Sequence, residues 1–311
     1  LRKSGIAGFN VPGLAERLVA SLFADDTTVF LSETDSYGEL MNLLRTWCTA
    51  SRAKFNNDKT TVIPVGTEAY RRQVVCLRKL SPRAESERLP ADIKILPDGQ
   101  AARVLGAWLG NNVDPSGAWT PVLDTVRRCL MRWNARRPTL NARRLIVNLE
   151  VGGQTQFLAR AQSMPPMVEK ALQKIITGFV WRYNSHHCVD IKTLHQPVSE
   201  GGLVLLDVKA RNEALDLVWM RDYLDLSERR HKWAYLADAV FAGAARTAHR
   251  TMAPEVKLNQ FIQTWKVNAK LNGPLPPDMA RAIRTARKYG LCAAAQKVDV
   301  LLQNELPIWA H

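Results

Sequence analysis

The segment of residues 18–31 constrains the fold of this chain more than any other stretch. It joins two runs that favour β-strand through the adjacent acids Asp25 and Asp26. Neighbouring residues of a strand point to opposite faces, so two adjacent acids share one site only where the chain turns. The pattern therefore predicts a β-hairpin with both acids at its bend. The pair is either part of a solvated turn, in which Asp is favoured, or a site for a hard cation that takes carboxylate oxygens.

A helix and another strand are predicted directly after the hairpin. Ser36 and Glu39 have the spacing of a capping box, in which each side chain binds a free backbone N–H at a helix start. Residues 55–60, Phe-Asn-Asn-Asp-Lys-Thr, then lead into an apolar strand at 61–65. This order predicts an α+β domain. Between the capping box and residue 55, apolar residues recur at helical spacing: Leu40, Leu43, Leu44, Trp47 and Cys48.

The order of these elements resembles the second half of a reverse-transcriptase palm, most closely that of LINE-like (non-LTR) retrotransposons. Residues 23–26, Phe-Ala-Asp-Asp, are similar to the Tyr/Phe-Ala-Asp-Asp metal motif of that family. Residues 55–60 are similar to its Leu-Asn-x-x-Lys-Thr motif, with Phe in place of Leu. Residues 104–106, Val-Leu-Gly, are similar to the Tyr-Leu-Gly turn that supports the primer end, with Val replacing the aromatic residue. Parts of residues 179–215 resemble the region that follows the polymerase.

The resemblance implies an RNA-directed DNA polymerase that uses an RNA template, a DNA primer and dNTPs. In such enzymes two Mg²⁺ ions activate the primer hydroxyl and neutralise charge on the transferred phosphate. Asp25 and Asp26 would be the metal ligands and, together with Lys59 near the phosphates, the catalytic residues. Leu105 and Gly106 would contact nucleic acid at the primer end.

The chain departs from the family pattern before the hairpin. The family has another metal-binding Asp on an earlier strand and a segment that contacts the dNTP. Here no Asp precedes Phe23, and Glu16 is the sole carboxylate in that stretch. We therefore expect an incomplete Mg²⁺ site, a fragment or degenerate copy that is inactive alone, and an exposed sheet edge.

A strong positive charge points to a polyanionic partner. The formal net charge is +14, with 43 Lys and Arg against 29 Asp and Glu. Residues 120–182 hold 11 Lys and Arg and 3 Asp and Glu, so +8 of the excess lies in about one fifth of the chain. Nucleic acid is the first expectation for such a distribution.

Thr120 and Pro121 predict the start of a helix in this basic segment. Arg128, Arg132 and Arg136 follow at steps of four residues, with Arg127 further round the helix. The stripe predicts either a thumb-like helix that binds backbone phosphates or a solvated face. The predicted apolar face consists of Val122, Val126, Cys129, Leu130 and Trp133.

Three segments are predicted, and the fold class is α+β. Residues 1–117 would be the C-terminal part of the palm, 118–182 a basic helical thumb-like region, and 183–311 a mainly helical post-polymerase region. No apolar run is long enough to span a bilayer and no signal peptide is visible, so we expect an intracellular protein of the nucleus or cytoplasm, with no membrane partner.

Two other classes of function compete with the polymerase. One is a non-catalytic basic nucleic-acid-binding protein derived from a retroelement, in which the Asp pair is a relic. The other is an interaction module whose basic stripe binds an acidic protein.

Overall fold

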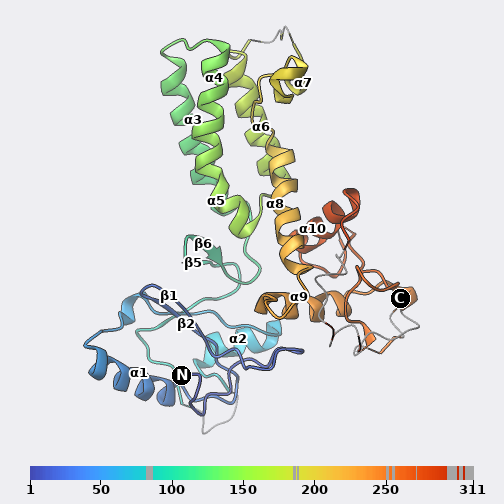
Figure 1. The fold of residues 1–311 in the computed structure, drawn as a ribbon. Helices are drawn as coiled ribbons and strands as arrows, with labels where there is room; N and C mark the ends of the chain where they lie inside the picture. The colour runs from blue at the N-terminus through green and yellow to red at the C-terminus, as the bar shows by residue number, and fades with distance from the viewer. Residues whose placement is uncertain are drawn as a thin grey trace. The chain divides into compact units, whose positions relative to one another are not determined.

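A computed structural model describes residues 1–81, 87–184, 187, 189–249, 252–253, 256–270, 272–292, 300 and 304. Helices and short strands are both present, so the fold is α+β at a coarse level. The chain divides into two compact units, Leu1–Asp114 and Pro115–His311. The first unit carries the described strands and the second is helical (Figure 1).

In the first unit, the described strands form three separate two-stranded sheets. β1 pairs antiparallel with β2 and β5 pairs antiparallel with β6, whereas β3 and β4 are parallel. Each described sheet therefore has two outer edges, so a wider sheet of the palm type is not formed by these residues. The elements are β1 (Ala20–Phe23), β2 (Asp26–Val29), α1 (Tyr37–Ser51), the 3₁₀ turn η1 (Asn57–Lys59), β3 (Thr61–Val62), α2 (Glu68–Leu77), β4 (Lys94–Ile95), β5 (Ala102–Val104) and β6 (Ala107–Leu109).

The start of α1 follows the predicted capping pattern. Ser36 is the N-cap, and its hydroxyl accepts a hydrogen bond from the Glu39 backbone N–H at 3.3 Å. Of the expected apolar face, Leu40 is buried, whereas Trp47 is exposed and packs against the Phe55 ring with centroids 5.6 Å apart. The apolar spacing therefore includes one position, Trp47, that the helix turns toward solvent, where Phe55 packs against its indole.

Asp35 fastens the N-terminal segment to the connection before α1. Its carboxylate accepts backbone hydrogen bonds from Ala7 at 2.6 Å, Gly8 at 3.0 Å and Ser32 at 2.8 Å. The bonds from Ala7 and Gly8 join residues 28 and 27 positions apart in the sequence, so Asp35 ties the N-terminal segment to the connection that follows the β1–β2 hairpin.

The second unit is built from helices. The helices α3, α4, α5, α6 and α8 pack side by side as a bundle (Figure 1). No helix among the described residues has the length and apolar character needed to cross a membrane. The elements are η2 (Gly117–Trp119), α3 (Thr120–Asn134), α4 (Leu140–Ile146), the π-helical turn η3 (Val147–Val151), α5 (Gly152–Gln162), α6 (Pro166–Val180), α7 (Ile191–His195), η4 (Val198–Glu200), α8 (Val208–Tyr223), α9 (Lys232–Gly243), η5 (Thr247–His249) and α10 (Pro277–Lys288).

Two apolar cores support this unit, and α8 contributes to both. The first core extends along the sequence from Trp119 to Leu215. The second begins with Met220 and ends with Ala286. Because the first core includes Leu194 on α7, the predicted segments 118–182 and 183–311 share one core.

The buried face of α3 differs from the predicted one. Leu123 is buried together with the expected Val126, Cys129 and Leu130. Trp133 is 38% exposed, and its indole N–H donates to a carboxylate oxygen of Glu150 at 3.2 Å. The prediction of Trp133 as a core residue is wrong, because this amphipathic ring lies at the rim, where its polar atom finds a partner.

The π-helical turn between α4 and α5 anchors a distant loop. The Asn148 amide donates to the Val204 carbonyl and accepts from the Leu206 N–H, both at 2.8 Å. The loop begins with Gly201, at φ +79°, and Gly202, where a Cβ would lie 2.0 Å from the Gln196 carbonyl oxygen. The glycine pair is therefore explained by a tight turn.

Candidate functional site

Asp25 and Asp26 lie at the bend of the β1–β2 hairpin, as the sequence predicts. Phe23 pairs with Asp26, so Ala24 and Asp25 form a two-residue turn. Ala24 adopts φ +51°, a left-handed conformation that hairpins usually assign to glycine at this position. The turn places Asp25 at the tip of the hairpin and Asp26 directly after it, at the start of β2.

This tip is open to solvent. Both aspartates are exposed, and they adjoin Leu22 and Phe23, which are 66% and 65% exposed. In the described part of the chain, no three His, Cys, Asp or Glu side chains group as metal ligands. Carboxylate oxygens are the ligand type that Mg²⁺ prefers, but two carboxylates are fewer than a pair of ions needs. This donor set by itself does not fit the implied two-ion centre.

Lys59 ends the short turn η1. Asn56 organises this turn, because its backbone carbonyl accepts from the Lys59 N–H at 3.2 Å and from the Thr60 hydroxyl at 3.0 Å. The Lys59 side chain is exposed, and no hydrogen bond or ion pair joins it to Asp25 or Asp26 among the described contacts. The structure thus places the three predicted catalytic residues in one unit, with Asp25 and Asp26 on the β1–β2 hairpin and Lys59 on a separate exposed turn.

Leu105 and Gly106 form the two-residue turn of the β5–β6 hairpin. Val104 pairs with Ala107, and the turn residues have φ +47° and +86°. Positive φ at both positions is typical of a type I′ turn, for which glycine is favoured. Leu105 is exposed at this tip, where it is free to contact a partner.

The four predicted nucleic-acid-binding arginines are exposed. Arg127 is engaged with Asp124, at 2.8 Å, and Arg132 lies close enough to Glu150 to help lower the pKa of that carboxyl, after the larger effects of hydrogen bonds from Trp133 and Cys129. Arg128 and Arg136 have no carboxylate partner among the described residues. Arg136 lies just beyond α3, which ends at Asn134, so the stripe continues into the following turn.

A shallow groove of about 740 Å³ lies at the start of α3. Arg127 and Arg128 line one part of it, and Arg128 is held by hydrogen bonds to the Thr125 hydroxyl at 3.2 Å and the Asp124 carbonyl at 3.4 Å. The groove therefore presents two guanidinium groups, of which only Arg127 is paired with a described carboxylate.

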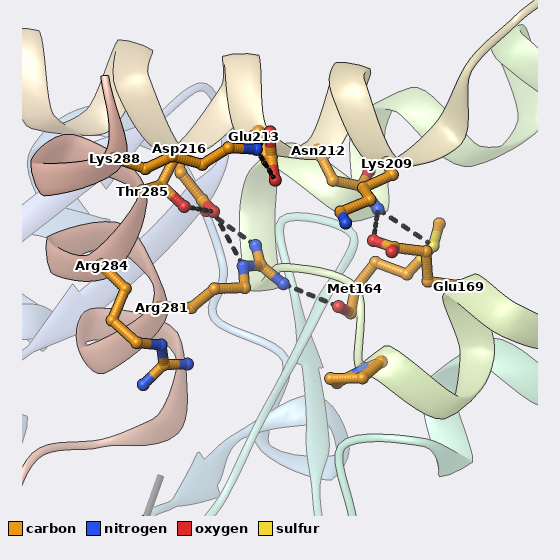
Figure 2. A pocket seen from close by; sticks show the side chains of 11 residues that line it. Met164, Glu169, Lys209, Asn212, Glu213, Asp216, Arg281, Arg284, Thr285 and Lys288 are labelled. Atoms are coloured by element: carbon orange, nitrogen blue, oxygen red, sulfur yellow. Dashed lines mark hydrogen bonds and ion pairs between the residues drawn. The ribbon is translucent and has the colours of Figure 1, made fainter. Parts of the chain in front are cut away.

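A second cavity, of about 280 Å³, was not predicted from the sequence (Figure 2). Arg281 on α10 points into it and binds both carboxylate oxygens of Asp216, at 2.7 and 2.8 Å, and the Met164 carbonyl at 2.7 Å. Burial alone would lower the pKa of Arg281, but the ion pair with Asp216 outweighs it and raises that pKa. Lys288 is likewise paired with Glu213, at 2.7 Å. The two ion pairs, Arg281 with Asp216 and Lys288 with Glu213, join α10 to α8 at the cavity.

No protein-family profile matches the sequence, and no curated protein is significantly similar to it.

Proposed function

We propose that the chain is part of an RNA-directed DNA polymerase of the LINE-like type, in which the β1–β2 hairpin supplies part of the metal-binding centre. The observation that carries this proposal is the hairpin bend. Asp25 follows the left-handed Ala24 in the two-residue turn, Asp26 begins β2, and both side chains are exposed. The capped helix α1 comes next, followed by the turn that ends with Lys59. The order of these elements along the chain is the order of the motifs on which the resemblance rests, and this order supports the proposal.

The proposal assigns this chain a share of the chemistry. The two carboxylates would hold metal only together with a further acid from a preceding palm segment. The exposed Leu22 and Phe23 and the open sheet edges would be covered by that segment. We expect the chain alone to incorporate no dNTP.

Primer extension on poly(rA)/oligo(dT) with Mg²⁺ and dTTP tests this proposal. The chain fused to an upstream palm segment of a LINE-like polymerase should synthesise DNA, and Asp25→Asn should abolish synthesis, because the amide keeps the shape and loses the charge that holds the metal. Asp92→Asn, which changes another exposed acid of the same unit, is the matched control and should keep wild-type activity. Activity of Asp25→Asn within a few fold of the control would place the metal site elsewhere.

A second candidate function is nucleic-acid binding without catalysis. The exposed arginines of α3 and the groove beside them support it, and neither depends on the aspartates. The two functions are separated by Asp25→Asn, which should leave nucleic-acid affinity unchanged in either case and remove synthesis only in a polymerase.

A further inference from the structure

A second basic region lies in the C-terminal part of the chain. Residues 241–292 contain 9 Lys and Arg and 2 Asp and Glu, a local charge of +7. This region is distant in sequence from α3, and it carries no motif of the polymerase resemblance. Its cations therefore need an explanation of their own.

Two of these cations, Lys266 and Arg287, contact one buried glutamine, Gln260, and Arg246 lies beside them. Arg246 and Lys266 lie next to each other, because Ala245 pairs with Val267 in an antiparallel bridge and the Arg246 N–H donates to the Lys266 carbonyl at 2.9 Å. Arg287 reaches over from α10 and donates to the Val267 carbonyl at 3.1 Å and to Oε1 of Gln260 at 3.0 Å. The Lys266 ammonium is 3.5 Å from the Gln260 carbonyl.

The two buried amide side chains next to this cluster each have an N–H group without a described acceptor. Gln260 is 2% exposed, and its Oε1 accepts from both Arg287 and the Val267 N–H, which fixes the orientation of the amide. Its Nε2 is buried and has no acceptor among the described residues. Asn259 repeats the pattern, since its Oδ1 accepts from the Phe261 N–H while its Nδ2 is buried without a partner.

The same cations also lack a counter-charge in the part of the chain that the structure describes. Among the described residues, no carboxylate forms an ion pair with Arg246, Lys266 or Arg287. Burial and the neighbouring Arg246 lower the pKa of Arg287. The opposite arrangement is found elsewhere on α10, where Arg281 and Lys288 each meet a carboxylate. A cluster of cations without a described carboxylate partner is complementary to an anion.

We propose that Arg246, Lys266 and Arg287, with Gln260 at their base, form a binding site for a phosphate group. A guanidinium presents a planar fork of N–H donors that matches phosphate oxygens, and the side chains of all three cations reach the surface. The phosphate belongs either to a free phosphate compound or to a nucleic-acid backbone. The site does not rest on the proposed polymerase function.

Calorimetric titration of the full chain with inorganic phosphate, and fluorescence anisotropy with a single-stranded oligonucleotide, test the proposal. Arg246→Gln/Lys266→Gln should weaken binding at least tenfold in one of these two arms. Lys170→Gln/Lys174→Gln removes the same charge from exposed positions of α6 and should leave that arm unchanged. Loss confined to the oligonucleotide arm identifies a backbone phosphate, and loss in the phosphate arm identifies a free one.

A third variant provides a test that does not depend on loss of binding. Gln260→Glu places a carboxylate among the three cations, so it should raise the melting temperature without phosphate and abolish the phosphate response. If the double variant and its control bind alike in both arms, or if Gln260→Glu lowers the melting temperature and keeps the response, the cluster is not a phosphate site.

Discussion

Arg143 allows a quantitative test of how the helical unit is held together. Its side chain is 2% exposed and has no carboxylate partner among the described residues. Instead it donates to the Phe179 carbonyl at 2.5 Å, the Pro138 carbonyl at 3.2 Å and Oδ1 of Asn134 at 2.8 Å, and it stacks over the Phe179 ring at 4.8 Å. Burial, and then Arg182, lower the pKa of Arg143, which remains a cation held by the ends of α3 and α6.

Replacing Arg143 by Met keeps most of the volume and removes one donor from three acceptors. The Phe179 carbonyl still accepts from the Arg182 N–H at 3.3 Å, so the two acceptors that lose the donor described for them are the Pro138 carbonyl and Oδ1 of Asn134. Each unpaired group costs about 1–3 kcal/mol, and because these two are partly buried and share one donor their effects add incompletely, so we expect a loss of roughly 2–4 kcal/mol. For a unit of this size each kcal/mol lowers the melting temperature by about 2–4 °C, which gives a decrease of roughly 4–16 °C.

Urea and thermal denaturation followed by circular dichroism measure this loss. Arg144→Met is the matched control, because Arg144 is the next residue on α4, is partly exposed and has a buried Nε without a partner. It should cost about 1 kcal/mol or less. Equal losses in the two variants would refute the assignment of Arg143 as the cation that joins α3, α4 and α6.

Two further predictions concern the turns that frame the proposed motifs. Burial would raise the pKa of Asp35, but hydrogen bonds from Ala7, Ser32 and Gly8 outweigh it and lower that pKa, so its contribution to stability is complete above the unfolded value near 3.9 and is lost as pH falls through the folded value. The free energy of unfolding of Asp35→Asn should therefore be about 1–2 kcal/mol lower than that of the wild type at pH 7. This difference should shrink as the pH falls toward 2. A difference in free energy of unfolding that does not depend on pH would contradict the assignment. Gly202→Ala should lower the free energy of unfolding by about 1–3 kcal/mol, because its Cβ would meet the Gln196 carbonyl. Gly153→Ala, on the open face of α5, is the control and should be neutral or stabilising. Chemical denaturation measures both variants, and equal stability would show that the loop is not tightly packed.

Local signals in the sequence predict much of the first unit. The hairpin follows from two strand-favouring runs around Asp25 and Asp26, and the start of α1 follows from the capping pattern of Ser36 and Glu39. In the second unit, the Gly201–Gly202 turn also has a local cause, which is the close approach of the Gln196 carbonyl. Each of these features depends on residues a few positions apart, so a pattern of neighbours is enough to reveal it.

Features that depend on distant residues could not be predicted in this way. Trp133 fits an apolar helical pattern, yet it lies at the rim because Glu150, on a different helix, binds its N–H. Arg143 looks like one more member of a basic stripe, and its burial depends on carbonyls up to 36 residues away. The cluster around Gln260 requires the chain to bring Arg246 and Arg287 together, which no spacing in the sequence encodes.

The α3 arginines allow a test of the proposal that this chain binds template and primer. Neutralised phosphates release counterions, so affinity for an RNA–DNA hybrid should fall steeply with salt, with about 0.7–0.9 of log–log slope for each contact. Replacing Arg128, Arg132 and Arg136 by Gln should flatten the slope by about 2–3 units, with little change in sequence preference, since backbone contacts do not read bases. Lys170→Gln/Lys174→Gln/Lys192→Gln removes the same charge from exposed sites on other helices and should flatten it less.

Fluorescence anisotropy of the folded variants across a salt series makes this comparison. We expect a steep slope for the wild type, a loss of about 2–3 units of slope in the α3 variant and a smaller loss in its control. A slope that is unchanged in the α3 variant would show that the stripe is only a solvated face and would contradict the assignment of this helix to template–primer binding.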